Sequence, residues 1–451
     1  MALAEDLEEF VADLHPYNVR YLFYMVTPNE TSFNTVDEVP DFVTKVTGWF
    51  LIVMMLEFIV IWIKGQKDGF AYNDTITSIS AGLFQQLLKI GGKTSSLACY
   101  IYIHEHFRLV DMPIDSWITW FVAFLAQDLS YYLAHRAIHE AGVFWSFHQM
   151  HHSSEYYNLS TGLRQGAVQE FGVIFFDCLQ SFFVPPPMFL THKLLNTIYQ
   201  FWIHTEVVPS LGPIEYIFNT PSHHRVHHGR NAYCIDKNYA GTLIIWDRLF
   251  GTFEAERKEE KPVYGLVDNV RSFNQLWLQF FEFKALGWDK GQKKDENGKP
   301  IFPGFFNKLK AAFFPPGYFP GTLTYQFFWW RTMSDSKEGI PKIEENVVRY
   351  NPDLSRQHKL YTFVQFVVLL FVYFHFHKVR QSLPWIHFAL YMAHMIVTLQ
   401  IMGMFFDHHK AARKVESIRQ MCTVMYSAYT LNWPLLIVSA ISELYLAKTH
   451  E

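Results

Sequence analysis

The sequence predicts an all-α protein, a polytopic transmembrane helical bundle that carries a histidine-rich metal site. Three observations support this prediction. Only 18% of the 451 residues are charged and 50% are hydrophobic, whereas a typical soluble domain is about 25% charged. Several apolar segments approach or exceed the ~18 residues that a membrane span requires. The chain also holds 22 histidines, many of them closely spaced.

Composition excludes several other classes of protein. Four cysteines in so long a chain do not make a disulfide scaffold, and the hydrophobic content excludes disorder. The 38 basic and 42 acidic residues give a net charge of −4, so no basic surface points to nucleic acid. A mean hydropathy of +0.02 is too low for a chain that lies wholly within a bilayer.

The first predicted elements are three apolar segments in the N-terminal third. Residues 46–63 form the first span, interrupted only by Glu57, which should face protein or water because a charge at mid-bilayer is costly. Residues 75–103 form a weaker segment with glutamine and lysine, which should contact other helices more than lipid. Residues 117–138 begin purely apolar and end in polar, histidine-bearing turns.

The middle of the chain predicts a helical hairpin followed by a long region without a clean span. Residues 168–184 and 188–203 are separated by Pro185, Pro186 and Pro187, and three prolines cannot continue a helix. We therefore expect two antiparallel helices. Residues 207–359 are rich in charge, Pro, Gly and Phe, a composition that suits a surface lying in the membrane interface.

Three further spans are predicted at the C-terminus, and they complete a division into four parts. The spans are residues 360–376, 386–406 and 421–446. The parts are an N-terminal segment (1–44), a metal-bearing membrane core (45–255), a charged and interfacial connecting region (256–359) and a C-terminal three-helix addition (360–451).

Basic residues beside short connections predict the orientation in the membrane. Lys64 and Lys67 follow the first span, and a second group precedes the last span: Lys410, Arg413, Lys414 and Arg419. Both groups should be cytosolic. The opposite side would then carry the N-terminal segment, whose Asn29-Glu30-Thr31 sequon is a glycosylation signal.

The most specific signal in the chain is one H-x3-H motif and two H-x2-HH motifs. Their members are His135, His139, His148, His151, His152, His224, His227 and His228. On a helix, spacings of three and four place side chains on one face, as shared metal coordination requires. A given H-x2-HH is expected about 0.05 times by chance in a chain this rich in histidine, so two copies indicate metal binding.

Eight neutral imidazoles exceed the needs of one metal, since a single zinc takes four ligands. Two metals that share them keep open positions, as catalytic sites require. His204, in FWIHTE, is predicted as a ninth ligand; the alternative is a core histidine bonded to a neighbour. Iron, zinc and copper all accept imidazole, so the ligand type does not select the metal.

Carboxylates near the motifs are expected to accept the second N–H of the metal-bound histidines. The candidates are Asp128, Glu140, Glu155, Glu170 and Glu206. Glu140, adjacent to His139, is the one predicted to act in the site. Histidines without motif spacing should make polar contacts between helices instead; these are His104, His106, His192, His375, His377, His387 and His394.

These motifs resemble the fatty acid hydroxylase superfamily of membrane di-iron enzymes, whose mark is H-x3-4-H followed by two H-x2-HH motifs. The resemblance covers roughly residues 72–253, including DLSYYLAHRAIHE, SFHQMHHSSEYYN, HTE and WDRLFGTFE. Within the superfamily, HHSSEYYNLSTGLRQ and the segment from NTPSHHRVHH to WDRLFGTF look most like the branch that cleaves ether lipids. The three C-terminal spans fit that branch better than its shorter relatives.

The resemblance implies an oxygenase with two iron ions, held by the eight motif histidines, with Glu140 as an associated acidic residue and His204 matching only loosely. It further implies tetrahydrobiopterin as reductant, an alkylglycerol lipid as substrate, and the endoplasmic reticulum membrane as location, with the metal site facing the cytosol. The expected reaction hydroxylates the carbon next to the ether oxygen and yields a fatty aldehyde and a glycerol product.

Three other interpretations compete with this one. The nearest is a sterol or fatty acyl hydroxylase or desaturase of the same superfamily, which takes electrons from a haem protein; the reductant that supports turnover separates the two. A metal transporter is a second, since histidines on a membrane helix line ion paths, but so many ligands would trap the metal. The third is an inactive receptor that keeps the metal site for structure.

Overall fold

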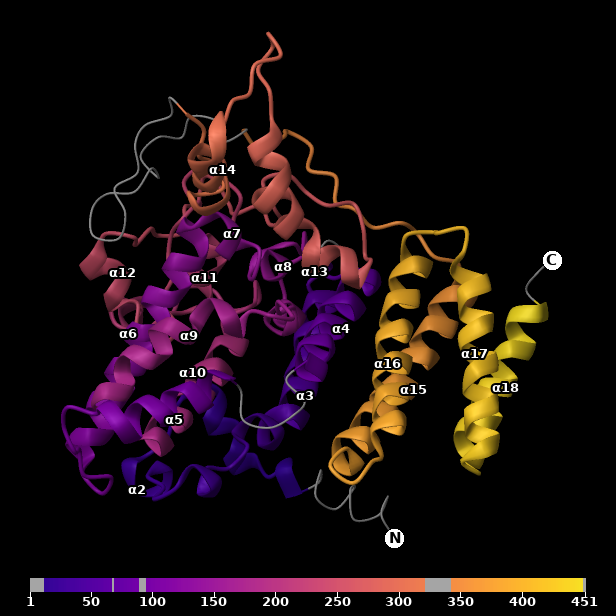
Figure 1. Cartoon of the computed structure of the whole chain (residues 1–451), viewed down its shortest axis with the longest axis horizontal. Coiled ribbons are helices and arrows are strands. Elements are labelled where there is room, and N and C mark those ends of the chain that lie inside the picture. The colour runs from indigo at the N-terminus through magenta and orange to yellow at the C-terminus, as the bar shows by residue number, and fades with distance from the viewer. Residues whose placement is uncertain (1–11, 67–68, 89–94, 321–341, 449–451) are drawn as a thin grey trace.

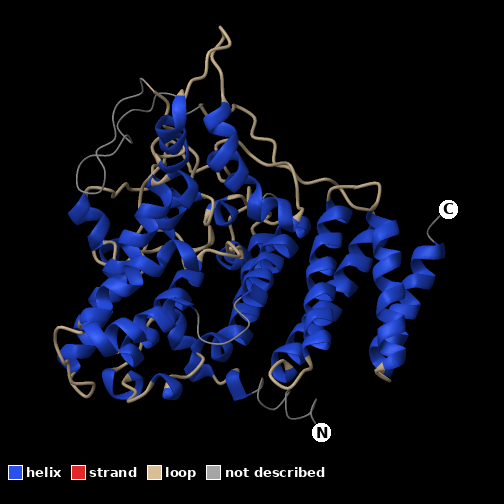
Figure 2. Ribbon diagram, in the orientation of Figure 1, coloured by secondary structure: helices blue, strands red, loops and turns tan. Residues whose placement is uncertain are grey.

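The computed structural model describes residues 12–66, 69–88, 95–320 and 342–448, and these residues form helices and loops without a β-strand (Figure 2). The predicted all-helical fold is confirmed. The N-terminal segment forms η1 (Pro16–Phe23), α2 (Pro28–Thr31) and η2 (Val36–Glu38). The core follows with α3 (Phe42–Ile63), α4 (Tyr72–Leu88), α5 (Ser95–Phe107), α6 (Trp117–Glu140), α7 (Gly142–Trp145), α8 (Gln149–His152), η4 (Leu159–Leu163), α9 (Glu170–Leu179), η5 (Gln180–Phe182) and α10 (Pro186–Trp202).

The remaining elements cover the core and then leave it. Short helices come first: η6 (Gly212–Tyr216), α11 (Pro221–His227), α12 (Ile245–Phe250), α13 (Gln275–Lys284), η7 (Ala285–Asp289), η8 (Lys290–Gln292) and α14 (Gly304–Phe313). The C-terminal bundle is α15 (Arg356–Val379), α16 (Trp385–Phe406), α17 (Ala412–Tyr429) and α18 (Trp433–Lys448). Figure 1 shows this bundle standing beside the core, with the N-terminal segment at the lower end of the molecule.

Three of the described helices are long and apolar enough to cross a membrane: Val36–Ile63, Arg356–Val379 and Trp385–Phe406. They confirm helices of spanning length and composition at the predicted spans 46–63, 360–376 and 386–406. Glu57 of α3 is buried, as expected, and its carboxylate accepts hydrogen bonds from the backbone N–H of Leu159 at 2.7 Å and from the Thr205 hydroxyl. Helices also form at the other predicted spans, but their crossing of the membrane stays a prediction.

The weaker segment at 75–103 is two helices, α4 and α5, instead of one, which corrects its predicted extent. Two glycines, Gly91 and Gly92, follow α4 in the sequence, and glycine is costly in a helix interior. Lys89 lies outside the described residues, as does Lys67 of the first basic pair. Because Asn73 and Asp74 are among many buried polar residues of α4, this helix contacts protein, as predicted.

The prediction of one span at 421–446 is wrong. This segment forms the end of α17 and most of α18, so the C-terminal addition has four helices. Leu431 between them is left-handed at φ 55°, and the Asn432 side chain accepts a hydrogen bond from Leu435 N at 3.3 Å. Pro434 has no N–H and is tolerated only in the first turn of a helix, so a helix ends before it and another begins.

Two helices form, as predicted, but α10 begins within the run of prolines, at Pro186, because proline is tolerated in the first turn of a helix. Both α9 and α10 pack against α6. They are bridged by Lys193 of α10, whose Nζ lies 3.1 Å from a Glu170 carboxylate oxygen and 2.6 Å from one of Asp177. This cross-link joins the two helices that pack beside α6.

The connecting region packs directly on the core through α13. Gln149, next to His148, donates from Nε2 to Leu278 O at 2.5 Å, and Gln279 Oε1 accepts from Ala167 N at 2.7 Å. The boundaries of the four predicted parts stay a prediction, but α13 makes the region from 256 a cover for the histidine loops. The interfacial role of residues 300–320 is likewise a prediction, which the exposed Phe305 and Phe306 of α14 favour.

The C-terminal bundle is joined to the core by close packing and by one carboxylate. A Cβ added at Gly403 of α16 would lie 2.2 Å from Phe273 O. Asp407, which follows α16, accepts hydrogen bonds from Ser272 Oγ at 2.6 Å, Phe273 N at 2.8 Å and Tyr350 Oη at 3.1 Å. An apolar cluster continues the joint between α4, α15 and α16; its members include Ile76, Phe84, Leu369, Phe376, Met395 and Phe406.

Candidate metal centre

The predicted ligand residues come from four separate places in the core. His135 and His139 lie in the last turns of α6, and His148, His151 and His152 form the start and body of α8. His224 and His227 lie on α11, with His228 directly after it. His204 follows α10. All nine side chains are buried, and the fold brings them together.

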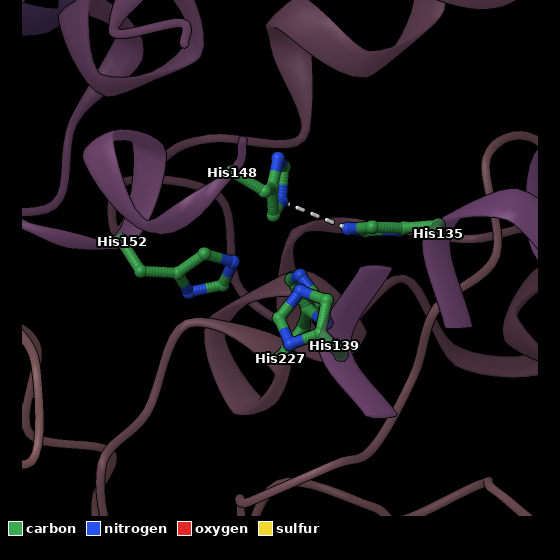
Figure 3. Close-up of side chains that lie close together, drawn as sticks. All are labelled: His135, His139, His148, His152 and His227. Atoms are coloured by element: carbon green, nitrogen blue, oxygen red, sulfur yellow. Dashed lines mark hydrogen bonds between the residues drawn. The ribbon is translucent and has the colours of Figure 1, made fainter. Parts of the chain in front are cut away.

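The nine histidines form two groups, in each of which the nearest ligand atoms all lie within 4.8 Å of one another. The first group is His135, His139, His148, His152 and His227, whose rings surround a common space in Figure 3. The second group is His151, His204, His224 and His228. The groups adjoin, since the rings of His152 and His228 stack with centroids 4.3 Å apart.

Each H-x2-HH motif is divided between the two groups. His148 and His152 belong to the first group, and His151 between them belongs to the second. Successive residues on a helix point about 100° apart, so neighbouring histidines face different centres, whereas residues four apart face the same one. One motif therefore serves both groups and sets them side by side.

Hydrogen bonds that Nδ1 donates fix the tautomer of five rings. The acceptors are Tyr239 O for His135 (2.8 Å), Gln169 Oε1 for His148 (3.2 Å), Arg164 O for His151 (3.0 Å), Gln200 O for His204 (2.6 Å) and Lys237 O for His227 (2.9 Å). A carbonyl oxygen can only accept, so Nδ1 carries the proton and, in the neutral ring, Nε2 presents a lone pair. This is the form in which imidazole binds a metal.

The lone pairs of two such rings face each other in each group. His135 Nε2 lies 3.0 Å from His148 Nε2, drawn as the dashed line in Figure 3, and His151 Nε2 lies 3.0 Å from His204 Nε2. Neither atom of either pair has a proton to donate, so the pairs are not ordinary hydrogen bonds. A cation between the rings resolves the repulsion, and the donor set therefore fits two metal ions.

Burial keeps these imidazoles neutral. Desolvation lowers the pKa of His148 to about 4 and that of His227 to about 3, because a charged imidazolium is disfavoured away from water. Among the described residues, the Nε2 atoms of His139, His152 and His227 have no hydrogen-bond partner. Buried polar atoms are rarely left unpaired, so these three atoms also favour a bound metal.

Glu140 lies beside the first group rather than within it. Its carboxylate forms a buried ion pair with Arg136, with Oε1 2.9 Å from Nε, and Arg136 also donates to Tyr132 Oη at 3.3 Å. The predicted role of Glu140 in the chemistry stays a prediction. His204, predicted as a ninth ligand, belongs to the second group, and its Nε2 lies within 3.2 Å of the Nε2 atoms of His151, His224 and His228.

The expectation that carboxylates accept the histidine N–H groups is wrong for the five bonds described above. Asp128 instead accepts hydrogen bonds from the backbone N–H groups of Thr242 and Leu243 and from the side chains of Asn196 and Trp246. Glu155 accepts from Tyr350 N. Glu206 accepts from Tyr264 Oη, and Glu170 pairs with Lys193. Four backbone carbonyls and the side chain of Gln169 perform this role instead.

Most histidines outside the motifs make the predicted contacts between elements. His104 bonds to Ser181 O, His192 to Tyr24 Oη, His387 to Tyr426 Oη and His394 to Thr423 Oγ1. The bonds described for His106 and His377 instead stay within one helical turn, to Tyr102 O and Arg380. The ring of His375 lies near that of Tyr391, at 6.1 Å between centroids.

Sequence reasoning missed the groups that orient the rings. The carbonyls of Arg164 and Gln200 could not be predicted from the sequence, because every residue has a backbone carbonyl. No motif pointed to the side chain of Gln169 either. The loop at 236–239 gave one: Asp236 and Asn238 are left-handed at φ 57° and 55°, and Asp and Asn tolerate this conformation better than most residues. Each of these two residues comes one position before a carbonyl that accepts a histidine Nδ1 proton, so the pair marks a loop with a defined shape.

Comparisons with known proteins place this centre among lipid-modifying enzymes. A family model described as fatty acid hydroxylase matches residues 120–252, the segment that contains all nine histidines. The chain is 46% identical over 408 residues to the alkylglycerol monooxygenase of Caenorhabditis elegans, with 90% of this chain and 81% of that protein covered. It is 43% identical over 410 residues to the Homo sapiens alkylglycerol monooxygenase, with 90% and 87% covered. No solved structure matches the chain.

Proposed function

The chain belongs to the alkylglycerol monooxygenase family, and from this premise we propose that it hydroxylates the carbon next to the ether oxygen of an alkylglycerol lipid, using dioxygen and tetrahydrobiopterin. The observation that carries the proposal is the pair of adjoining histidine groups within a chain that matches these relatives along 90% of its length. The products are a fatty aldehyde and a glycerol.

The reaction balances with one two-electron reductant. One oxygen atom of dioxygen enters the C–H bond beside the ether oxygen, and the other leaves as water after taking two electrons and two protons. The hydroxylated carbon is a hemiacetal, whose C–O bond to glycerol breaks as its hydroxyl proton moves to the glycerol oxygen. That C–H bond is the weakest along the alkyl chain because the oxygen lone pair stabilises the carbon that loses hydrogen.

Two iron ions held by the two groups would supply the activation of dioxygen. We propose His135, His139, His148, His152 and His227 as ligands of one ion, and His151, His204, His224 and His228 as ligands of the other. The chain's own contribution is to fix the rings through their Nδ1 bonds and to exclude water by burying them. Glu140 is proposed as the acidic group of the site.

Basic residues favour an orientation in which the metal centre lies on the cytosolic side of the endoplasmic reticulum membrane. Lys410, Arg413 and Lys414 follow Asp407, which bonds to Tyr350, and Tyr350 N bonds to Glu155 beside the α8 histidines. This turn therefore lies at the same end of the protein as the metal centre, and cytosolic ends carry the excess of Lys and Arg. Arg419, counted with this group from the sequence, instead pairs with Glu416 inside the bundle at 2.7 Å.

The test is turnover of a defined substrate by the purified full-length chain. The protein, loaded with ferrous iron in detergent, is incubated with an alkylglycerol labelled in its alkyl chain, and the fatty aldehyde is measured by mass spectrometry. We expect aldehyde only with reduced pterin. The His139→Ala variant should be inactive, and His192→Ala, a buried histidine outside both groups, should remain active.

Two results would overturn the proposal. One is an equal rate without pterin. The other is turnover of sterols or fatty acyl lipids, but not of alkylglycerol, when a haem protein supplies the electrons, because that outcome assigns the chain to the neighbouring reactions of the superfamily.

A further inference from the structure

A single loop orients two rings of the first histidine group. Lys237 O accepts the Nδ1 proton of His227 at 2.9 Å, and Tyr239 O accepts that of His135 at 2.8 Å. The two rings come from α11 and α6, which are far apart in the sequence. Any movement of this loop therefore changes the aim of two Nε2 atoms toward the same centre.

The second group takes its Nδ1 acceptors from elsewhere. Arg164 O, after η4, serves His151 at 3.0 Å, and Gln200 O, in α10, serves His204 at 2.6 Å. No described Nδ1 bond of the second group involves the 236–240 loop. The loop is thus specific to one of the two centres.

Asp247 holds this loop in place. Its two carboxylate oxygens accept Tyr239 N at 2.8 Å and Ala240 N at 2.9 Å, and the first oxygen also accepts Thr252 Oγ1 at 2.7 Å. The side chain is fully buried at 0% exposure, and charge-assisted bonds of this kind are about twice as strong as neutral ones. None of the described hydrogen bonds of the Asp247 carboxylate goes to a histidine, so Asp247 acts through the backbone.

Asn238 locks the same loop from its other side. Its Nδ2 donates to His223 O at 3.0 Å and to Glu254 O at 2.7 Å, and its Oδ1 accepts from Glu254 N at 2.9 Å. These bonds support the left-handed conformation of Asn238, at φ 55°. The loop is therefore held from two sides, by Asp247 and by Asn238, as expected of a backbone segment that has to present two carbonyls in fixed directions.

We propose that Asp247 is a positioning residue for the first metal only: it fixes the Lys237 and Tyr239 carbonyls, which aim His227 and His135 at that metal. The proposal rests on the two-metal centre of the proposed function but not on its substrate. Outer groups of this kind typically contribute 10- to 100-fold in metal affinity, and Asp247 should contribute such a factor to one centre and none to the other.

The chain offers a matched control in Asp128. This carboxylate is also 0% exposed, and it also accepts two consecutive backbone amides, Thr242 N at 2.8 Å and Leu243 N at 3.0 Å. The carbonyl of Thr242 accepts Asn219 N at 2.8 Å instead of a histidine. The described partners of Asp128 are Thr242, Leu243, Asn196 and Trp246, and none of them accepts a histidine Nδ1 proton. Removing the Asp128 charge should therefore cost stability without the direct effect on ring-orienting carbonyls that Asp247→Asn has.

The experiment measures metal affinity at each centre separately in the full-length protein, with Co²⁺ as the probe because its absorption reports the ligand geometry. His204→Ala isolates the first centre, and in this background Asp247→Asn should weaken Co²⁺ binding 10- to 100-fold and alter the cobalt spectrum. His139→Ala isolates the second centre, where Asp247→Asn should change neither affinity nor spectrum. Asp128→Asn should shift neither centre selectively.

The proposal is wrong if Asp247→Asn weakens both centres equally or leaves the first unchanged. If Asp247→Asn does not fold, Thr252→Val decides, since it removes only one bond to the carboxylate and should weaken the first centre by a smaller factor. The proposed function fails in a different way: the unsubstituted protein binds two Co²⁺ ions, but the same protein loaded with ferrous iron does not consume alkylglycerol.

Discussion

His151 Nε2 and His204 Nε2 lie 3.0 Å apart although each ring gives its Nδ1 proton to a backbone carbonyl. Two lone pairs at this distance repel unless a cation lies between them. His204 was the one predicted ligand outside the three motifs, yet it contacts three others of its group: His151, His224 and His228. Its position makes it central to the second centre.

The first prediction concerns this residue. His204→Ala should lower the metal content of the protein from two ions to one and abolish turnover, because the second group keeps only three histidines. Metal content is measured by mass spectrometry after removal of loosely bound ions. His192→Ala is the matched control, since His192 is also fully buried but bonds to Tyr24 Oη; two ions retained in His204→Ala would refute the assignment.

A second prediction concerns the metal-free protein at acid pH. Burial lowers the pKa of His148 from 6.5 to about 4, so the unfolded chain binds more protons than the folded one between these values. Stability therefore rises with pH across this window, and it is lost as the pH falls from about 6.5 to about 4, by about 3 kcal/mol for this group. The thermal midpoint of metal-free protein should fall accordingly.

The control for this pH dependence is His148→Asn, which keeps a polar side chain but does not titrate. Its midpoint should fall less steeply between pH 6.5 and pH 4 than that of the unsubstituted chain. Parallel curves for the two proteins would show that another group governs the acid sensitivity.

A third prediction separates the structural and chemical roles of Glu140. Glu140→Gln leaves Arg136 buried without its carboxylate partner, and breaking a buried pair costs about 3–5 kcal/mol. The double variant Arg136→Met with Glu140→Gln should recover most of this stability. If Glu140 takes part in the chemistry, aldehyde formation stays low in the stable double variant; recovery of the full rate would make the residue purely structural.

The histidine spacing predicted that the motifs would meet, and it could not predict how they divide. The pattern H-x2-HH is compatible with one centre or with two, and the division of His148 and His152 from His151 follows from the direction each residue takes on α8. No motif marks His204 as a ligand, because its partners His151 and His228 are 53 and 24 residues away in the sequence.

The long apolar segments and the break at the three prolines were predicted correctly, but the breaks within 75–103 and 421–446 were not. Residues 421–446 have the composition of a span, but Asn432 and Pro434 contain the information for a break: one caps the new helix and the other cannot continue the old one. The acceptors of the histidine N–H groups had no such signal apart from Asp236 and Asn238, because a loop's path depends on contacts with distant residues such as Asp247.

A fourth prediction tests the orientation through glycosylation. Asn29 is exposed and lies in α2, which Figure 1 draws at the end of the molecule opposite α7 and α11. If the metal centre faces the cytosol, Asn29 is lumenal and receives a glycan. Because Thr31 of the sequon is buried in the folded chain, the transfer has to occur during synthesis. Endoglycosidase should then increase the gel mobility of the protein, but not that of Asn29→Gln.

The control for orientation is a sequon at the other end. His409→Asn with Ala411→Thr creates one in the turn between α16 and α17, and this site should stay unmodified. A glycan at residue 409 and none at Asn29 would invert the proposed orientation.

The last prediction concerns the joint between the C-terminal bundle and the core. In an exposed helix, Gly→Ala stabilises by about 1 kcal/mol because alanine is the better helix former. At Gly403 the new Cβ would meet Phe273 O at 2.2 Å, and a backbone carbonyl cannot yield as a flexible side chain does. Steric overlap should therefore outweigh propensity: Gly403→Ala should lower the thermal midpoint in detergent. Gly317→Ala is the control: open space surrounds its Cβ, so this variant should not lower the thermal midpoint. A raised midpoint for Gly403→Ala would show that the bundle is free to move away from the core.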